Sequence, residues 1–200
     1  MQLDTLEKNL KKRGFVPFFV KDSSQAIQVI KELIPKNSSI GFGGSVTVDQ
    51  IGLLDAIKDD YKLLHRSLYD IEYHKKLYKE MMDADWYITS TNALTMTGEL
   101  VNIDGRANRV ASMLFGPENI LVVAGKNKIV ADIEEGIRRC RDQAAPPNAV
   151  RLDKKTPCKV TGKCEYCFSP DTMCKATVIQ HHPTSGKNVY IIVIDQELGY

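Results

Sequence analysis

The stretch Ser39-Ile-Gly-Phe-Gly-Gly-Ser-Val-Thr47 decides the fold class of this chain. Ser38 to Phe42 is apolar enough to form a buried strand, and Gly43-Gly44-Ser45 interrupts it. Thr47 and Gln50 then stand three residues apart, a spacing that predicts a capping box at the start of a helix. A strand that turns through glycines into a helix is typical of an α/β fold.

The same alternation of strands and helices continues along the chain. The expected strands are 15–20, placed at a sheet edge by Pro17, then 61–64, 85–89, 119–124 and 187–194, with a hairpin over 93–104. The expected helices are 1–10, 24–33, 71–82, 107–115, one from Lys128 to Arg141 that ends before Ala144-Ala-Pro-Pro147, and one after Cys174 that ends at His181-His182. We therefore expect one α/β domain over residues 1–200, with a sheet of mainly parallel strands between helices on both faces.

The composition excludes several classes of function. A net charge of +2 gives no reason to expect general binding to nucleic acid. The longest aliphatic run, Val189 to Ile194, is too short to span a membrane, and the N-terminus lacks the apolar core of a signal peptide. We expect a cytoplasmic protein, where a cluster of cysteines is more often metal-binding or catalytic than disulfide-bonded.

The turn after the first glycine-rich strand is a candidate ligand site. Gly43 and Gly44 free backbone N–H groups, and Ser45 and Thr47 add hydroxyl groups, so the turn could hold a carboxylate, a phosphate or an acyl oxygen. Val46 replaces the third glycine of the dinucleotide fingerprint, and no phosphate-loop motif is present. A plain helix cap explains these residues equally well.

A second candidate turn, Gly125-Lys126-Asn127-Lys128, follows the buried strand 119–124. Ligands of open α/β sheets bind beyond the carboxyl ends of the strands, so both turns could border one crevice. Lys126 and Lys128 would then supply charge and Asn127 would orient a small anionic metabolite. We expect at least one of the two lysines to lie in solvent instead.

The segment from Thr97 to Arg109 adds further polar candidates. Asn102, Asp104, Asn108 and Arg109 could reach the same crevice, where Arg109 could hold a carboxylate through its planar fork. The local alternative is that Asp104 caps the next helix and pairs with Arg109. Glu99 is expected to be exposed on the hairpin turn.

The sharpest chemical signal is the cysteine-rich loop of residues 156–176. Cys158, Cys164, Cys167 and Cys174 have the spacing Cys-x5-Cys-x2-Cys-x6-Cys. An iron–sulfur cluster accepts four thiolates at varied spacings, whereas structural zinc sites usually have two closely spaced pairs and this loop has one. Free thiols are a third possibility. Cys140 shares a helical face with Ile133 and Ile137 and is expected to be a buried, inert thiol.

Several separated motifs, taken together, resemble the lactate-utilisation (LUD) domain family. They are Gly41-Phe-Gly-Gly-Ser-Val-Thr47, Asn102-Ile-Asp-Gly-Arg-Ala-Asn-Arg109, Phe115-Gly-Pro117, Gly125-Lys-Asn-Lys128 and Ala144-Ala-Pro-Pro-Asn148. The resemblance covers about residues 14–200. It implies the fold of sugar-phosphate isomerases and CoA transferases, and a link to bacterial lactate oxidation with iron–sulfur partner subunits. Because the chain lacks ferredoxin-like cysteine repeats, it resembles a small partner subunit or an independent relative.

Two functions remain open on this basis. The first is an iron–sulfur or metal-binding accessory protein of lactate and pyruvate redox metabolism, with a crevice for a small anion and with redox partner subunits. The second is an isomerase- or transferase-type enzyme acting on a phosphorylated or CoA-linked substrate, in which the cysteines hold structural zinc. A regulatory or assembly module without catalysis is a third, less specific reading.

Overall fold

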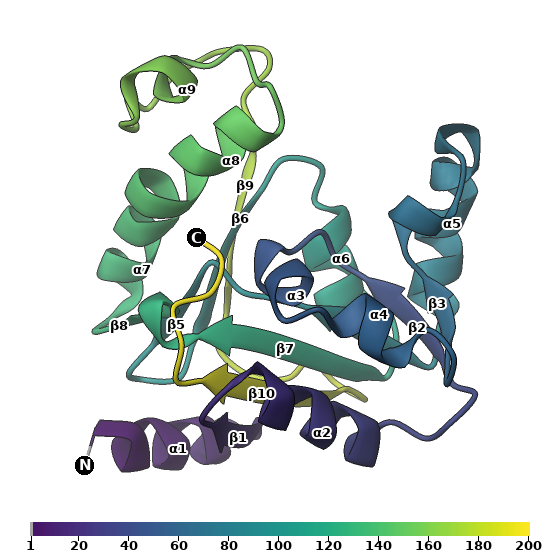
Figure 1. The fold of residues 1–200 in the computed structure, drawn as a ribbon. Coiled ribbons are helices and arrows are strands. Elements are labelled where there is room, and N and C mark those ends of the chain that lie inside the picture. Colours follow the sequence, from purple (N-terminus) through teal and green to yellow (C-terminus); the bar gives the residue numbers. More distant parts are fainter. Residues whose placement is uncertain (1) are drawn as a thin grey trace.

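A parallel sheet of six strands forms the centre of the computed structural model, which describes residues 2–200 (Figure 1). Its order is β1-β10-β7-β4-β2-β3, and every neighbouring pair is parallel. The strands are β1 (Val16–Val20), β2 (Ser39–Phe42), β3 (Lys62–Leu64), β4 (Trp86–Thr89), β7 (Asn119–Gly125) and β10 (Asn188–Ile194). The α/β class and the edge position of the strand with Pro17 are confirmed.

Helices cover both faces of this sheet because its central strands are apolar on both sides. The helices of the two faces are α1 (Gln2–Lys12), α2 (Ser23–Leu33), α3 (Val46–Gln50), α4 (Leu53–Ile57), α5 (His74–Glu80) and α6 (Asn108–Phe115). One core cluster joins α2, α3 and α4 to residues such as Ile88 and Val123. The other joins α1, α5 and α6 to residues such as Tyr87 and Val122. The expected three layers are therefore present.

A second sheet of four strands stands beside the first. It contains β5 (Ala93–Thr95), β6 (Leu100–Asp104), β8 (Ile129–Val130) and β9 (Ala176–Gln180) in the order β8-β5-β6-β9. The expected hairpin is confirmed as the antiparallel pair β5–β6. The segment after Cys174 was expected to be a helix, which is wrong: it forms β9, whose residues pair with β6 along its whole length.

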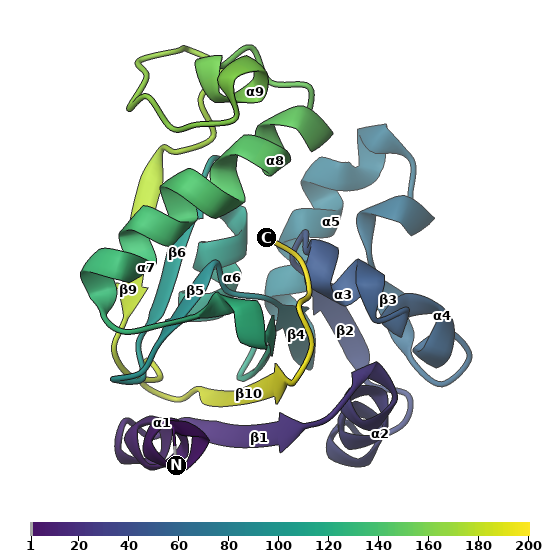
Figure 2. The ribbon, with the colours of Figure 1, turned by 60° about the vertical axis from the view of Figure 1, so that its left-hand side comes forward.

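One long helical arm runs alongside β6 and β9 (Figure 2). It consists of α7 (Ile133–Arg139), the π-helical turn η5 (Cys140–Ala144) and α8 (Ala145–Arg151). The helix was expected to end before Ala144-Ala-Pro-Pro147, which is wrong. Pro146 and Pro147 occupy the first turn of α8, where a missing N–H costs nothing, and the wider π turn precedes them.

Beyond α8 the chain forms a small cysteine lobe, residues 156–175, which includes the short helix α9 (Pro157–Thr161). After β10 the chain crosses back between α8 and α3, as both ribbon views show (Figures 1 and 2). We call residues 195–200 the C-terminal strap. Among residues 2–200, no helix combines the length and the apolar character that crossing a membrane requires.

Candidate functional site

A cavity of about 940 Å³ lies where three parallel strands end. Gly44 and Ser45 follow β2, Ser90 to Asn92 follow β4, and Lys128 follows β7; all of them line the cavity. The chain leaves β2 toward β3 on one side of the sheet, whereas β4 leads to β7 on the other side. The cavity therefore lies at a topological switch point, where ligands of open α/β sheets bind.

The turn after β2 is shaped by a close backbone approach. A Cβ atom on Gly43 would lie 2.5 Å from Thr89 Oγ1 and 2.9 Å from the Tyr87 hydroxyl, so only glycine fits there. The helix cap differs from the expected capping box: Ser45 is the N-cap of α3 and accepts a hydrogen bond from Val48 N. Thr47 lies inside the helix, fully buried, and donates from Oγ1 to the Leu198 carbonyl at 3.2 Å.

The end of β4 supplies cavity residues that the sequence reasoning missed. Ser90 and Thr91 are buried, and both line the cavity together with Asn92. A signal for them exists in the sequence, because the polar run Thr89-Ser90-Thr91-Asn92 follows a buried apolar strand directly. Because β4 is parallel to β2 and β7, its carboxyl end lies at the same edge of the sheet as theirs.

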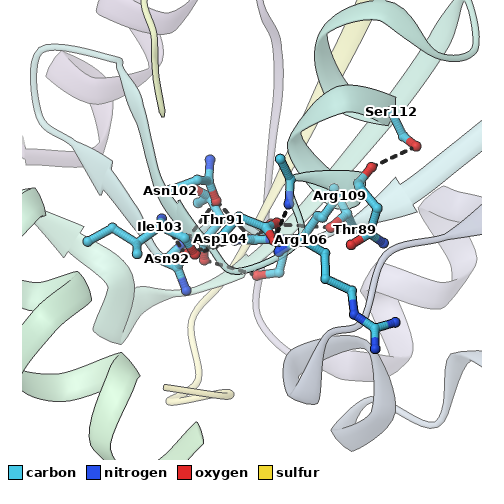
Figure 3. A network of polar contacts seen from close by, with 12 residues as sticks. Thr89, Thr91, Asn92, Asn102, Ile103, Asp104, Arg106, Arg109 and Ser112 are labelled. Atoms are coloured by element: carbon cyan, nitrogen blue, oxygen red, sulfur yellow. Dashed lines mark hydrogen bonds and ion pairs between the residues drawn. The ribbon is translucent and has the colours of Figure 1, made fainter. Parts of the chain in front are cut away.

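Arg109 joins the ends of β4 and β6 to the start of α6 (Figure 3). Its Nε donates to Asp104 Oδ2 at 3.3 Å, Nη1 donates to Ser90 O and Asn102 Oδ1, and Nη2 donates to Asn92 Oδ1 and Ile103 O. Each nitrogen of the guanidinium group is thus already engaged by the protein. Arg109 borders the cavity, but its guanidinium group already bonds to other residues of the protein and stabilises the wall.

The other polar candidates between residues 102 and 108 differ in their contacts and in whether they line the cavity. Asp104 pairs with Arg109, as the local alternative predicts. It accepts from the N–H groups of Arg106 and Ala107 in the turn before α6, but it does not cap this helix, whose N-cap is Ala107. Asn102 is almost fully buried beside Arg109 and is not part of the cavity wall. Asn108 does line the cavity.

Glu99 was expected to be exposed on the hairpin turn, which is wrong. It is only 4% exposed, and it forms an ion pair with Arg13 and accepts hydrogen bonds from Thr95 and Thr97. Burial opposes the ionisation of Glu99, but these hydrogen bonds and the Arg13 charge outweigh it and lower its pKa. Glu99 therefore fixes the hairpin against α1.

The two lysines of the turn after β7 lie in different environments. Lys126 is exposed, pairs with Asp195 at 2.9 Å and is not part of the cavity wall, whereas Lys128 is 3% exposed and lines the cavity. Lys128 Nζ donates to Ser90 Oγ at 3.0 Å and to the Thr91 carbonyl at 3.1 Å. Burial, with the nearby charges of Arg139 and Arg109, lowers the pKa of Lys128 to about 7.

The C-terminal strap passes over this buried lysine. The Asn127 side chain accepts from Leu198 N and donates to Gly199 O, so it holds the strap rather than facing the cavity. The Tyr200 hydroxyl contacts Arg151 Nε at 2.7 Å and Asn148 Oδ1 at 3.2 Å on α8. The strap thereby connects both walls of the cavity, and Tyr200 is part of its lining.

The wall of the cavity carries a large excess of positive charge. It contains eight lysine and arginine residues and two aspartates, and each aspartate pairs with a wall cation, Asp104 with Arg109 and Asp171 with Lys154. Within residues 2–200, no carboxylate lies at ion-pair distance from the other six: Arg66, Lys75, Arg106, Lys128, Arg151 and Lys175. Such a wall favours anions over neutral or cationic ligands.

The cysteine lobe borders the same cavity through Cys174. All five cysteines are free thiols. The pKa of Cys174 is raised, mainly by burial, and the thiols of Cys158, Cys164 and Cys167 are close enough to add to this effect. Cys140 is buried against Val101, and burial raises its pKa to about 11, so the expected burial of this thiol is confirmed.

The four lobe thiols fit the chemistry of a thiolate-bound centre in kind. Each of the other three acts electrostatically on Cys174, so they share one region of the lobe. Within residues 2–200, however, no three cysteine, histidine or acidic side chains stand close enough together to hold a metal ion. A metal centre here therefore requires the lobe to contract around it.

Comparison with known proteins agrees with this architecture. A family model described as the LUD domain matches residues 3–194. A DUF162 family protein from Deinococcus radiodurans superimposes with a TM-score of 0.57 at 16% identity, over 96% of both chains. Ribose 5-phosphate isomerases from Neisseria gonorrhoeae and Plasmodium falciparum match about half of the chain, with TM-scores of 0.36 and 0.33 and identities of 16% and 15%. None of the curated proteins compared with the chain matches it.

Proposed function

Because the chain belongs to the LUD domain family, we propose that it serves lactate utilisation by binding a small carboxylate such as lactate or pyruvate in the cavity beside the cysteine lobe. The observation that supports this proposal is the excess of positive charge around the cavity. Six wall cations have no carboxylate partner at ion-pair distance within residues 2–200, and like charges that share one cavity repel each other, although only Lys128 of the six is buried. A bound anion would relieve that repulsion.

Thermal unfolding with and without ligand tests the anion site. Lactate and pyruvate should raise the melting temperature in a saturable way, and sodium chloride at equal ionic strength should not. Arg66→Gln, which removes a wall cation beside Gly44, should weaken this effect. Lys62→Gln, which removes an exposed cation of β3 outside the cavity wall, is the matched control. Equal loss in both variants, or no stabilisation by either acid, would refute the site.

We propose in addition that Cys158, Cys164, Cys167 and Cys174 hold an iron–sulfur cluster. Such a cluster supplies one-electron transfer, and four thiolates are its usual ligands. The support is the gathering of four free thiols in one lobe at the rim of the cavity. Redox partner subunits would then exchange electrons at this lobe, on which Val160, Tyr166 and Phe168 are exposed.

Anaerobic purification, followed by iron and sulfide analysis, tests the cluster. The expected result is a brown protein whose broad visible absorbance is bleached by dithionite. Cys164→Ala should lose the colour, whereas Cys140→Ala, which removes a buried thiol outside the lobe, should keep it. A colourless protein with stoichiometric zinc would replace this proposal by the structural-zinc alternative, and a metal-free protein would remove both.

A further inference from the structure

The proposed anion site does not fully explain why the amine of Lys128 is buried. It lies in the cavity wall with only 3% of its surface exposed. Its hydrogen-bond partners, Ser90 Oγ and the Thr91 carbonyl, are both uncharged. No carboxylate within residues 2–200 lies at ion-pair distance from it, and a buried lysine that serves structure is normally paired.

The charged groups around Lys128 favour its neutral form. Arg139 on α7 and Arg109 on α6 both oppose protonation, and burial does so more strongly than either; the thiol of Cys140 on η5 acts weakly in the other direction. The segment after β4 contributes the Ser90 hydroxyl and the Thr91 carbonyl, and Ser90 in turn contacts the Thr47 hydroxyl of α3 at 3.5 Å. The pKa of about 7 leaves a substantial share of the amine unprotonated at neutral pH. A lysine that is desolvated beside other cations is a recognised form of activated nucleophile.

A hydroxyl group for proton transfer is already in position. Ser90 Oγ lies 3.0 Å from Lys128 Nζ and 3.5 Å from Thr47 Oγ1. Ser90 lines the cavity as well, so its hydroxyl can pass a proton between the amine and an oxygen atom of a bound ligand.

We infer that the Lys128 amine forms an imine with the carbonyl carbon of a short 2-oxo carboxylic acid bound in this cavity. Nitrogen attacks the carbonyl carbon, and the carbonyl electron pair moves to oxygen, which takes the proton given up by nitrogen through Ser90. The resulting carbinolamine loses its hydroxyl group, which leaves as water with the second proton of the nitrogen when the C=N bond forms, so no oxidant or reductant is needed. The inference rests on the proposed function in one respect: the wall cations hold the carboxylate of the same ligand.

Borohydride trapping with pyruvate tests the imine directly. The purified full chain is incubated with pyruvate or with lactate, which has no carbonyl carbon to attack, and is then treated with sodium borohydride. Intact mass should rise by one reduced pyruvate adduct with pyruvate alone, and peptide mapping should assign the adduct to Lys128. Trapping should increase from about pH 6 to about pH 8 as the amine loses its proton. An adduct spread over surface lysines would overturn the inference.

Variants and binding data separate this inference from the anion site. Lys128→Met should abolish trapping and Lys126→Arg, at an exposed position outside the cavity wall, should leave it unchanged. Ser90→Ala should slow trapping at least tenfold while lactate still raises the melting temperature. Because mapping uses the unmodified chain, it decides the matter even if a variant fails to fold. Stabilisation by lactate and pyruvate without any adduct would refute the imine alone, whereas no stabilisation by either acid would refute the anion site.

Discussion

Arg109 is the residue on which the cavity wall depends most. Its guanidinium donates to five acceptors contributed by β6 and by the segment after β4. Arg109→Ala should therefore cost about 3 to 5 kcal/mol in the free energy of unfolding, because it leaves Asp104 and several carbonyl groups without their donor. Arg109→Lys should recover little of this loss, since an ammonium group cannot reproduce the planar fork.

Urea denaturation of the Arg109 variants provides the measurement, with Arg106→Ala as control. Arg106 lines the same cavity, but it is exposed and forms no ion pair within residues 2–200. Its removal should change the free energy of unfolding by less than about 0.5 kcal/mol. Similar losses in Arg106→Ala and Arg109→Ala would contradict the role assigned to the network.

Lys128 should make stability depend on pH in the alkaline range. Its pKa is about 7 in the folded chain, below the ordinary value of 10.5, so between these values the unfolded chain binds more protons. Stability contributed by this residue therefore rises with pH across that window, and the full penalty of burying the charge is present below pH 7. Lys128→Met should stabilise the protein by about 1 to 4 kcal/mol near pH 6.

Melting temperatures measured across the pH range check this expectation. The gain in Lys128→Met should shrink steadily toward pH 10, where the wild-type amine is neutral in the folded chain as well. Lys126→Met removes an exposed lysine paired with Asp195, so its melting temperature should follow the wild type throughout. If the gain in Lys128→Met stayed constant from acid to alkaline pH, the pKa of the Lys128 amine would not be lowered by burial.

The sequence was most informative at positions whose structure depends on local residue types. The carboxyl-end rule predicts that the turns after β2 and β7 border one crevice, and Lys126 lies in solvent, as expected for at least one of the two lysines. The burial of Lys128 could not be predicted, because it depends on Ser90 and on a strap some seventy residues further along. Arg109 has the same character: its partners lie on segments that only the folded chain brings together.

The C-terminal strap is the element whose geometry is most restricted. Gly199 has a positive φ of 63°, and a Cβ atom there would lie 2.4 Å from Thr47 Oγ1 and 3.2 Å from Lys128 Nζ. Gly199→Ala should detach the strap, with faster hydrogen exchange at Leu198 and Gly199 while the amides of β10 stay protected. The cost combines backbone strain with a steric clash.

Gly186→Ala separates these two contributions. Gly186 also has a positive φ, but nothing lies within 4 Å of its Cβ position, so this variant suffers the strain alone, about 1 kcal/mol. Hydrogen exchange in the strap should be normal in Gly186→Ala. If both variants behaved alike, the clash with Thr47 and Lys128 would be too small to matter and the strap would have room to shift.

At the level of elements, local signals gave the central sheet but not the arm or the strand that follows the cysteine lobe. Strands β2, β4, β7 and β10 are short apolar runs between turn residues, so their type is fixed locally. Pro146 and Pro147 predict a helix end, yet a π turn in front of them lets the helical path continue into α8. β9 forms because β6 presents an open edge, which is a tertiary effect.

At the scale of the whole molecule, α8 connects two segments that are far apart in sequence. Asn148 Oδ1 accepts from the Tyr200 hydroxyl of the strap, and Asn148 Nδ2 contacts Met173 Sδ in the cysteine lobe at 3.3 Å. The strap and the lobe both border the cavity, so this side chain links two parts of its rim. A ligand that binds in the cavity should therefore affect the lobe through α8, and a ligand that binds in the lobe should affect the cavity.

Asn148→Ala should therefore loosen both segments at once. Hydrogen exchange should accelerate in residues 196–200 and also in residues 169–175, with each opening made easier by roughly 1 kcal/mol, the contribution of a typical hydrogen bond. Asn188→Ala, at the start of β10, removes an exposed amide that donates to Asn119 Oδ1 at the start of β7, and it should leave both segments unchanged. Faster exchange in the strap without any change in the lobe would mean that the two parts of the rim move independently, because Met173 would then keep its place without Asn148.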